Sequence, residues 1–260
     1  GSADRAGLRH DDPLALKRAS SRRPRRVWLF DLDNTLHDAS HAAFAPISAA
    51  MTGYIVDHLG LDADAATALR QHYWRRYGAT LLGMVRHHAV EAGHFLEQTH
   101  RLPGLEERVR SSAHDRAALR RLAGRKYVLT NAPRRYAERV LDALGLARSF
   151  DGVIGIEDMA VFGRLRPKPD RRMLRRVAAR LGVLPEHCVL VEDTLVHQKA
   201  ACSLGMRTIW MQRYLGGRFR GPLSNAAKAS ARSAEVGVHR CPKPLYVCAR
   251  IKSLRELLRD

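Results

Sequence analysis

The sequence predicts an α/β fold: a doubly wound parallel sheet with an inserted helical segment. Six short apolar runs have the length of buried strands, and they lie at 27–32, 126–131, 152–157, 188–193, 207–212 and 245–251. The runs are continuous rather than alternating, which is typical of parallel strands covered by helices on both faces. Helical patterns separate most of them, and this order of strands and helices favours the doubly wound class.

The expected helices follow from the spacing of apolar residues. In 170–182, an apolar stripe runs along one face from Met173 to Leu181, and Gly182 follows as a stop signal. The interval between the first two strands is too long for a single crossover helix. It contains helical patterns broken near Gly60, Gly78, Gly93 and Pro103-Gly104, so that four helices are expected at 43–60, 62–77, 79–92 and 105–122.

Three parts are predicted from these elements. Residues 1–25 form a basic tail without a stable fold, because they are polar and rich in arginine. Residues 26–39 and 113–260 form the α/β core, in which 213–242 is expected to be a long loop. Residues 40–112 form a helical cap over the carboxyl ends of the strands.

The net charge of +19 suggests a polyanionic partner, but its distribution argues otherwise. Residues 1–26 and 213–260 carry most of the excess positive charge. The charge is therefore expected on a tail and a loop and not on a rigid surface. No apolar run is long enough to span a membrane, and the N-terminal arginines precede no signal-peptide core. The four cysteines show no CxxC spacing, which favours a reduced, cytoplasmic protein.

Polar side chains cluster where the predicted strands end. Asp31 and Asp33 end the first strand, Thr130-Asn131 the second and Glu192-Asp193 the fourth, and Lys168 follows the third. In an open α/β sheet, ligands bind at the carboxyl ends of the strands. These groups are therefore expected to share one site.

The residue types suggest phosphoryl chemistry. Asp31, Asp33 and Asp193, with Glu192 nearby, offer the hard oxygen ligands that suit Mg²⁺. One carboxylate can attack phosphorus to give an aspartyl phosphate, and a second can protonate the leaving oxygen and later activate water. Thr130 and Asn131 can donate hydrogen bonds to the transferring oxygens.

These residues resemble the four motifs of the haloacid dehalogenase-like (HAD) hydrolase superfamily. The matching stretches are Asp31-Leu32-Asp33-Asn34-Thr35-Leu36, Thr130-Asn131, Lys168-Pro169 and Val191-Glu192-Asp193-Thr194. The resemblance implies a Rossmann-like core with a helical cap after the first motif. It also implies a catalytic set of Asp31 as nucleophile, Asp33 as general acid and base, Thr130 and Asn131 on the phosphoryl group, and Lys168 orienting Asp31. The implied Mg²⁺ ligands are Asp31, the Asp33 backbone carbonyl and Asp193, with Glu192 beside them.

A finer resemblance lies in the cap. The stretch Tyr73 to Met84, YWRRYGATLLGM, is similar to one found in the pyrimidine 5′-nucleotidase branch. It implies a nucleoside monophosphate as substrate, and we assign Asn34, Thr35, Tyr77 and Thr80 to substrate binding. The alternative is that Tyr77, Leu81 and Met84 only pack helices together, with Gly78 and Gly83 allowing a close approach.

Two positions depart from the pattern. Gln198 stands where many superfamily members have a further Asp, and His197 stands where the nucleotidase branch often has Asn. In the loop after the first motif, His37 and Asp38 are interpreted as hinge or surface residues rather than substrate contacts.

The sequence thus predicts a Mg²⁺-dependent phosphatase that acts on a small phosphate ester, and the resemblance in the cap implies a nucleoside 5′-monophosphate. Two alternatives stay open: a phosphatase or phosphomutase for a sugar phosphate or other metabolite, and a protein that binds nucleic acid through its basic tails. The second alternative is not favoured, because aromatic residues for base stacking are scarce in both tails. No membrane partner is expected.

Overall fold

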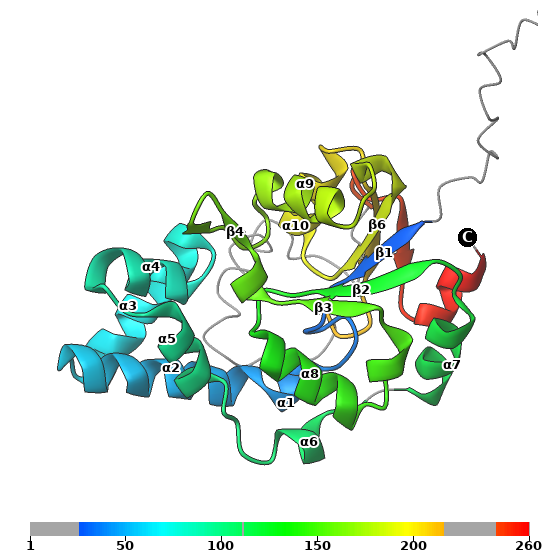
Figure 1. Ribbon diagram of the computed structural model, residues 1–260. Coiled ribbons are helices and arrows are strands. Elements are labelled where there is room, and N and C mark those ends of the chain that lie inside the picture. The colour runs from blue at the N-terminus through cyan, green and yellow to red at the C-terminus, as the bar shows by residue number, and fades with distance from the viewer. Residues whose placement is uncertain (1–25, 111, 216–242, 260) are drawn as a thin grey trace, which may run out of the picture.

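The computed structural model describes residues 26–110, 112–215 and 243–259 (Figure 1). The predicted basic tail at 1–25 and most of the predicted loop at 213–242 lie outside the described residues. Within the described ranges, no helix is long and apolar enough to cross a membrane.

The core is a six-stranded sheet in the order β3-β2-β1-β6-β7-β8. All five neighbouring pairs are parallel, as predicted. The strands are β1 (Val27–Phe30), β2 (Arg125–Leu129), β3 (Gly152–Ile154), β6 (Cys188–Glu192), β7 (Arg207–Met211) and β8 (Ala249–Ile251). Each one lies where an apolar run predicted a strand, and each is shorter than its run.

Helices cover both faces of this sheet (Figure 1). On one face, α9 (Arg171–Arg180) packs through Met173, Leu174 and Val177, the stripe predicted from the sequence. α10 (Leu195–Cys202) packs on the same apolar cluster through Ala201. The opposite face is covered by α7 (Ala113–Arg121), α8 (Arg134–Ala143) and the 3-10 helix η4 (Leu254–Arg259). The doubly wound α/β class is therefore confirmed.

The inserted segment is helical. Four helices, α2 (Phe44–Leu59), α3 (Ala63–Tyr77), α4 (Thr80–His88) and α5 (Ala92–Thr99), form a group to one side of the sheet (Figure 1). They share an apolar cluster of their own, which includes Ile55, Tyr73, Met84 and Phe95. Ile156, just after β3, joins this cluster and so connects the insert to the core.

The short helices α1 (Ala39–Ala42) and α6 (Leu105–Arg108) flank the insert. Ala42, Leu105 and Val109 pack with the main cluster under the sheet rather than with the insert. The cap boundaries 40–112 remain a prediction, and this packing favours a cap that ends before Leu105.

Two predicted helices were wrong in extent. The helix expected at 79–92 ends at His88, where Ala89 takes a left-handed φ of 52°. Glu91 then caps a new helix by accepting hydrogen bonds from the backbone of Gly93 and His94, so Gly93 lies in the first turn of a helix instead of breaking one. The helix expected at 105–122 is divided, because Val109 is extended and Ser112 caps α7.

One pair of strands was missed. β4 (Ala160–Val161) and β5 (Arg164–Leu165) form an antiparallel hairpin after β3. Two residues each are too few to produce an alternating pattern. The remaining 3-10 helices are η1 (Ala147–Ser149), η2 (Ile156–Asp158) and η3 (Pro185–His187).

Gly83 allows α4 to lie directly on α3. A Cβ added at Gly83 would lie 2.1 Å from Cγ of Tyr73, and Tyr73 is buried with its hydroxyl 2.7 Å from Nε2 of His88. We therefore expect Gly83→Ala to destabilise the protein by about 1–3 kcal/mol in urea unfolding, because the ring has to move. Gly53→Ala is the matched control: Gly53 is exposed in α2 with nothing within 4 Å of an added Cβ. It should stabilise slightly, and a Gly83→Ala protein as stable as this control would contradict the prediction.

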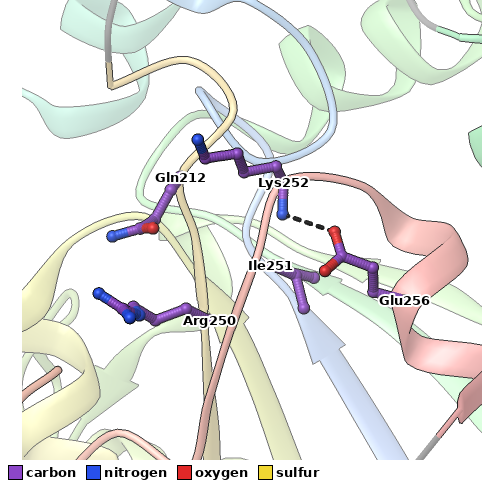
Figure 2. Close-up of a pocket in the computed structure, with 5 residues that line it drawn as sticks. All are labelled: Gln212, Arg250, Ile251, Lys252 and Glu256. Atoms are coloured by element: carbon purple, nitrogen blue, oxygen red, sulfur yellow. Dashed lines mark hydrogen bonds between the residues drawn. The ribbon is translucent and has the colours of Figure 1, made fainter. Parts of the chain in front are cut away.

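A surface hollow of about 350 Å³ lies where β7 and β8 end, and Figure 2 shows its lining. The residues around it are Gln212, Arg250, Ile251, Lys252 and Glu256. The backbone N–H of Lys252 donates to Oε1 of Glu256 at 2.9 Å. None of these residues was predicted to be catalytic, and the predicted site lies at the central strands instead.

Candidate active site

The carboxyl ends of the central strands hold the predicted catalytic residues. β1 lies between β2 and β6, and the ladder continues one residue beyond two of the strands. The N–H of Asp31 donates to the carbonyl of Val191 at 2.9 Å, and that of Thr130 donates to the carbonyl of Ile154 at 3.0 Å. Asp31, Thr130 and Glu192 therefore emerge from neighbouring strands at one edge.

Lys168 links two of the carboxylates. Its Nζ lies 2.7 Å from Oδ1 of Asp31 and 2.7 Å from Oε2 of Glu192, and all three side chains are buried. Asn131 fixes the backbone of Lys168 from both sides: its Nδ2 donates to the Lys168 carbonyl at 3.0 Å, and its Oδ1 accepts from the Lys168 N–H at 2.9 Å. The structure thus gives Asn131 the task of holding Lys168.

Burial and charge set the protonation of this cluster. Burial, with the charge of Glu192 added, raises the pKa of Asp31 to about 6 against the opposing effect of Lys168. Burial would lower the pKa of Lys168, but the charges of Asp31 and Glu192 outweigh it, and the lysine stays a cation. For Glu192 the cost of burial is outweighed by Lys168 and His197, so that its pKa falls well below its usual range. Burial and the neighbouring carboxylates raise the pKa of Asp193 well above its usual range.

Three carboxylates can converge on one cation. Oxygens of Asp31, Glu192 and Asp193 lie within 4.8 Å of one another. Both Glu192 oxygens already have partners, since Oε2 faces Lys168 and, at 3.0 Å, Nδ1 of His197, while Oε1 accepts from the N–H of Thr194. Asp31 and Asp193 are therefore the better placed direct ligands, and Glu192 stays a predicted ligand beside them. An excess of carboxylate over Lys168 fits a hard divalent cation such as Mg²⁺.

Asp33 is held apart from this cluster. The strand ends at Phe30, and the following loop includes Asn34 at a left-handed φ of 60°. The Oδ1 of Asp33 accepts from the hydroxyl of Tyr136 at 2.8 Å and lies 2.9 Å from Nε2 of His37. The two aspartates of the first motif thus face different partners.

The other predicted residues of the loop are placed close by. Asn34 pairs with Ser40: its Nδ2 donates to the Ser40 hydroxyl at 2.9 Å, and its Oδ1 accepts from the Ser40 N–H at 3.0 Å. Thr35 is buried, and its hydroxyl has no partner among the described residues. The Thr130 hydroxyl accepts from the N–H of Ala132 at 3.0 Å, which leaves its own proton for another acceptor.

The two cap residues are engaged within the cap. Thr80 is buried, and its hydroxyl donates to the carbonyl of Arg70 at 3.1 Å. This bond joins α3 to the start of α4, and the substrate contact of Thr80 stays a prediction. The hydroxyl of Tyr77 lies 2.6 Å from Nε2 of His87, and the guanidinium of Arg86 lies over its ring. Tyr77 stays a predicted substrate residue, without a contact to the carboxylates in the described part of the chain.

Three polar residues of the site escaped the sequence analysis or were given other roles. Tyr136 was missed; it lies six residues after Thr130, on the first turns of α8, and that position was the available signal. His37, interpreted as a hinge or surface residue, is fully buried against Asp33. Gln198 replaces the expected Asp with a structural bond, because its Nε2 donates to the carbonyls of Glu192 and Ile209 and so ties β6 to β7.

The fold and this site define a class of doubly wound α/β proteins with an acidic centre at the strand ends and a helical insert. A family model described as haloacid dehalogenase-like hydrolase matches residues 26–205. The chain therefore belongs to that family, as its four motifs predicted.

A distant relative comes from yeast. Phosphate metabolism protein 8 of Saccharomyces cerevisiae is 24% identical over 195 residues, which are 70% of this chain and 60% of the yeast protein. The chain thus spans less than two thirds of that relative.

Among solved structures, CbbY from Rhodobacter sphaeroides in complex with phosphate has a TM-score of 0.56 at 18% identity, over 90% of this chain and 96% of that one. A HAD phosphatase from Thermococcus onnurineus has a TM-score of 0.54 at 20% identity, over 90% and 96%. YfnB from Bacillus subtilis, bound to magnesium, has a TM-score of 0.51 at 18% identity, over 90% and 97%. At these identities the likeness concerns the fold.

Proposed function

We propose that this chain is a Mg²⁺-dependent phosphatase that hydrolyses a small phosphate monoester through an aspartyl-phosphate intermediate. One observation carries the proposal: Asp31 is paired with the buried cation of Lys168, while Asp33, two residues on, is held by Tyr136 and His37. This gives two carboxyl groups with different environments, as nucleophile and acid require.

The first half-reaction uses both carboxyls. A carboxylate oxygen of Asp31 attacks phosphorus, and the bond between phosphorus and the ester oxygen breaks. The leaving oxygen takes the proton of Asp33, so an alcohol departs and Asp33 becomes a carboxylate. Lys168 keeps Asp31 oriented, and the Thr130 hydroxyl is free to donate to the phosphoryl group.

The second half-reaction restores the enzyme. Asp33 takes a proton from water as the water oxygen attacks phosphorus, and the bond between phosphorus and Asp31 breaks. Inorganic phosphate leaves, and Asp33 is protonated again. Asp31, Asp193 and the backbone carbonyl of Asp33 would hold Mg²⁺, which supplies charge that offsets the phosphoryl oxygens.

We further propose a nucleoside 5′-monophosphate as the substrate. The support is the cap stretch from Tyr73 to Met84, with Tyr77 at its edge, and the acidic pair Glu192-Asp193. The match to a yeast protein named for phosphate metabolism agrees with phosphate-ester chemistry. The three described cysteines Cys188, Cys202 and Cys248 are free, which agrees with a reducing, cytoplasmic setting.

A phosphate-release screen tests this proposal. Nucleoside monophosphates, sugar phosphates and p-nitrophenyl phosphate are compared with Mg²⁺ and with excess chelator. We expect Mg²⁺-dependent release of inorganic phosphate, fastest with UMP or CMP. If only a sugar phosphate is turned over fast, the substrate is a sugar phosphate and not a nucleotide. Isomerised sugar phosphate without release of inorganic phosphate would indicate a mutase. No reaction with any ester would overturn the proposal.

A further inference from the structure

The hydrogen bonds to Asp33 both reach the same carboxyl oxygen. Tyr136, from α8, and His37, from the loop after β1, meet at Oδ1. We propose that Tyr136 and His37 are positioning residues that fix the Asp33 carboxyl through Oδ1 and so reserve Oδ2 for proton transfer. This inference rests on the proposed phosphatase function and extends it to residues outside the four motifs.

Tyr136 is built to be a rigid donor. Its side chain is 1% exposed and belongs to the main apolar cluster, while the ring of His100 packs edge-on against it at 5.7 Å. Burial and the nearby charge of Asp33 raise the pKa of Tyr136 well above its usual range, so the hydroxyl keeps its proton. A fully packed ring with one polar atom aimed at a carboxyl leaves that atom one role, which is to donate.

His37 is a second donor. The side chain is fully buried, Nε2 lies 2.9 Å from Oδ1 of Asp33, and Nδ1 has no partner among the described residues. A buried N–H without an acceptor is costlier than a lone pair without a donor. An N–H therefore belongs on Nε2, where it is donated to Asp33.

Two donors on one oxygen decide which oxygen can carry the acid proton. An oxygen that accepts two hydrogen bonds has its lone pairs occupied. In the protonated carboxyl, Oδ1 is then the carbonyl oxygen, and the proton lies on Oδ2. Asp33 is about one fifth exposed, whereas Asp31 and Glu192 are nearly closed to solvent, so Oδ2 has access to an ester oxygen and later to water.

The test is Tyr136→Phe, which removes the hydroxyl and keeps the ring. A misplaced acid should matter most where the leaving oxygen needs a proton. We therefore expect kcat/KM for the best alkyl phosphate of the screen to fall about 10–100-fold, within the range that general acid catalysis contributes. With p-nitrophenyl phosphate, whose leaving group departs as a stable anion, the loss should be about threefold or less under the same rule.

The controls separate positioning from packing. Tyr127→Phe, on β2 and away from the site, should leave kcat/KM unchanged for both substrates. His37→Leu should repeat the Tyr136→Phe pattern, and His37→Gln, which keeps a donor near the former Nε2, should recover part of it. In an Asp33→Asn background, Tyr136→Phe should cause little further loss, because the group that it positions is already gone.

The outcomes distinguish this inference from the function beneath it. The positioning role is overturned if wild type hydrolyses esters but Tyr136→Phe lowers kcat/KM equally for both substrates. It is also overturned if Tyr136→Phe causes the same loss of kcat/KM in the Asp33→Asn background as in wild type. Unfolding midpoints of all variants show whether an equal loss reflects damaged packing. If wild type hydrolyses no phosphate ester, the proposed function itself has failed.

Discussion

Asp31→Asn and Asp33→Asn should both stop steady turnover, but they should stop it at different steps. Asp31→Asn removes the nucleophile, and kcat should fall by about 10⁴-fold or more. Asp33→Asn keeps the nucleophile paired with Lys168 and removes proton transfer, which contributes about 10²–10⁴-fold. With p-nitrophenyl phosphate the Asp33→Asn protein should still be phosphorylated, because that leaving group needs little protonation, and it should then hydrolyse slowly.

The measurement is a rapid-quench experiment read by intact-protein mass. Asp33→Asn should release a burst of p-nitrophenol and gain one phosphoryl group, whereas Asp31→Asn should show neither. Asp38→Asn is the control from the same loop: the Asp38 carboxylate caps α1 by accepting from the N–H of His41 at 3.1 Å, so near-normal kcat is expected. A phosphorylated Asp31→Asn protein would show that another residue is the nucleophile.

The site could be predicted from the sequence to the extent that topology fixes it. Asp31, Thr130 and Glu192 end strands that are neighbours in a parallel sheet, so any sequence that forms these strands brings the three together. The topology of the sheet does not place Lys168, because this residue comes from a loop. Its position depends on the two hydrogen bonds with Asn131. The role of Lys168 in orienting Asp31 was predicted from the family resemblance, because the spacing of the residues alone does not give it.

Contacts between distant elements were beyond prediction. The hydroxyl of Tyr136 meets Asp33 across 103 residues of chain, and its position six residues after Thr130 is a weak signal that does not name the partner. The bond from the hydroxyl of Thr80 to the carbonyl of Arg70 on a neighbouring helix was likewise not predicted, because it also joins two separate elements. The predicted helix ends were wrong where a capping side chain had more effect than a glycine, as Glu91 has near Gly93.

Lys168→Met should cause the largest loss of stability among the site variants. The lysine is fully buried between Asp31 and Glu192, and its removal leaves two buried carboxylates without their cation. Breaking such a pair typically costs about 3–5 kcal/mol, which urea unfolding without Mg²⁺ would measure. Turnover should also fall by about 10²–10³-fold, as when a preorganised charge is lost from an active site.

A second substitution decides whether charge is the cause. Glu192→Gln removes one of the two uncompensated carboxylates. The double variant Lys168→Met/Glu192→Gln should therefore be more stable than Lys168→Met alone. In the wild-type background, Glu192→Gln by itself should be destabilising. Lys252→Met, at an exposed lysine, should change unfolding little and controls for the substitution itself. If the two site substitutions only add their losses, the lysine acts through packing volume, and the electrostatic account of Asp31 as an ionised, oriented nucleophile loses its main support.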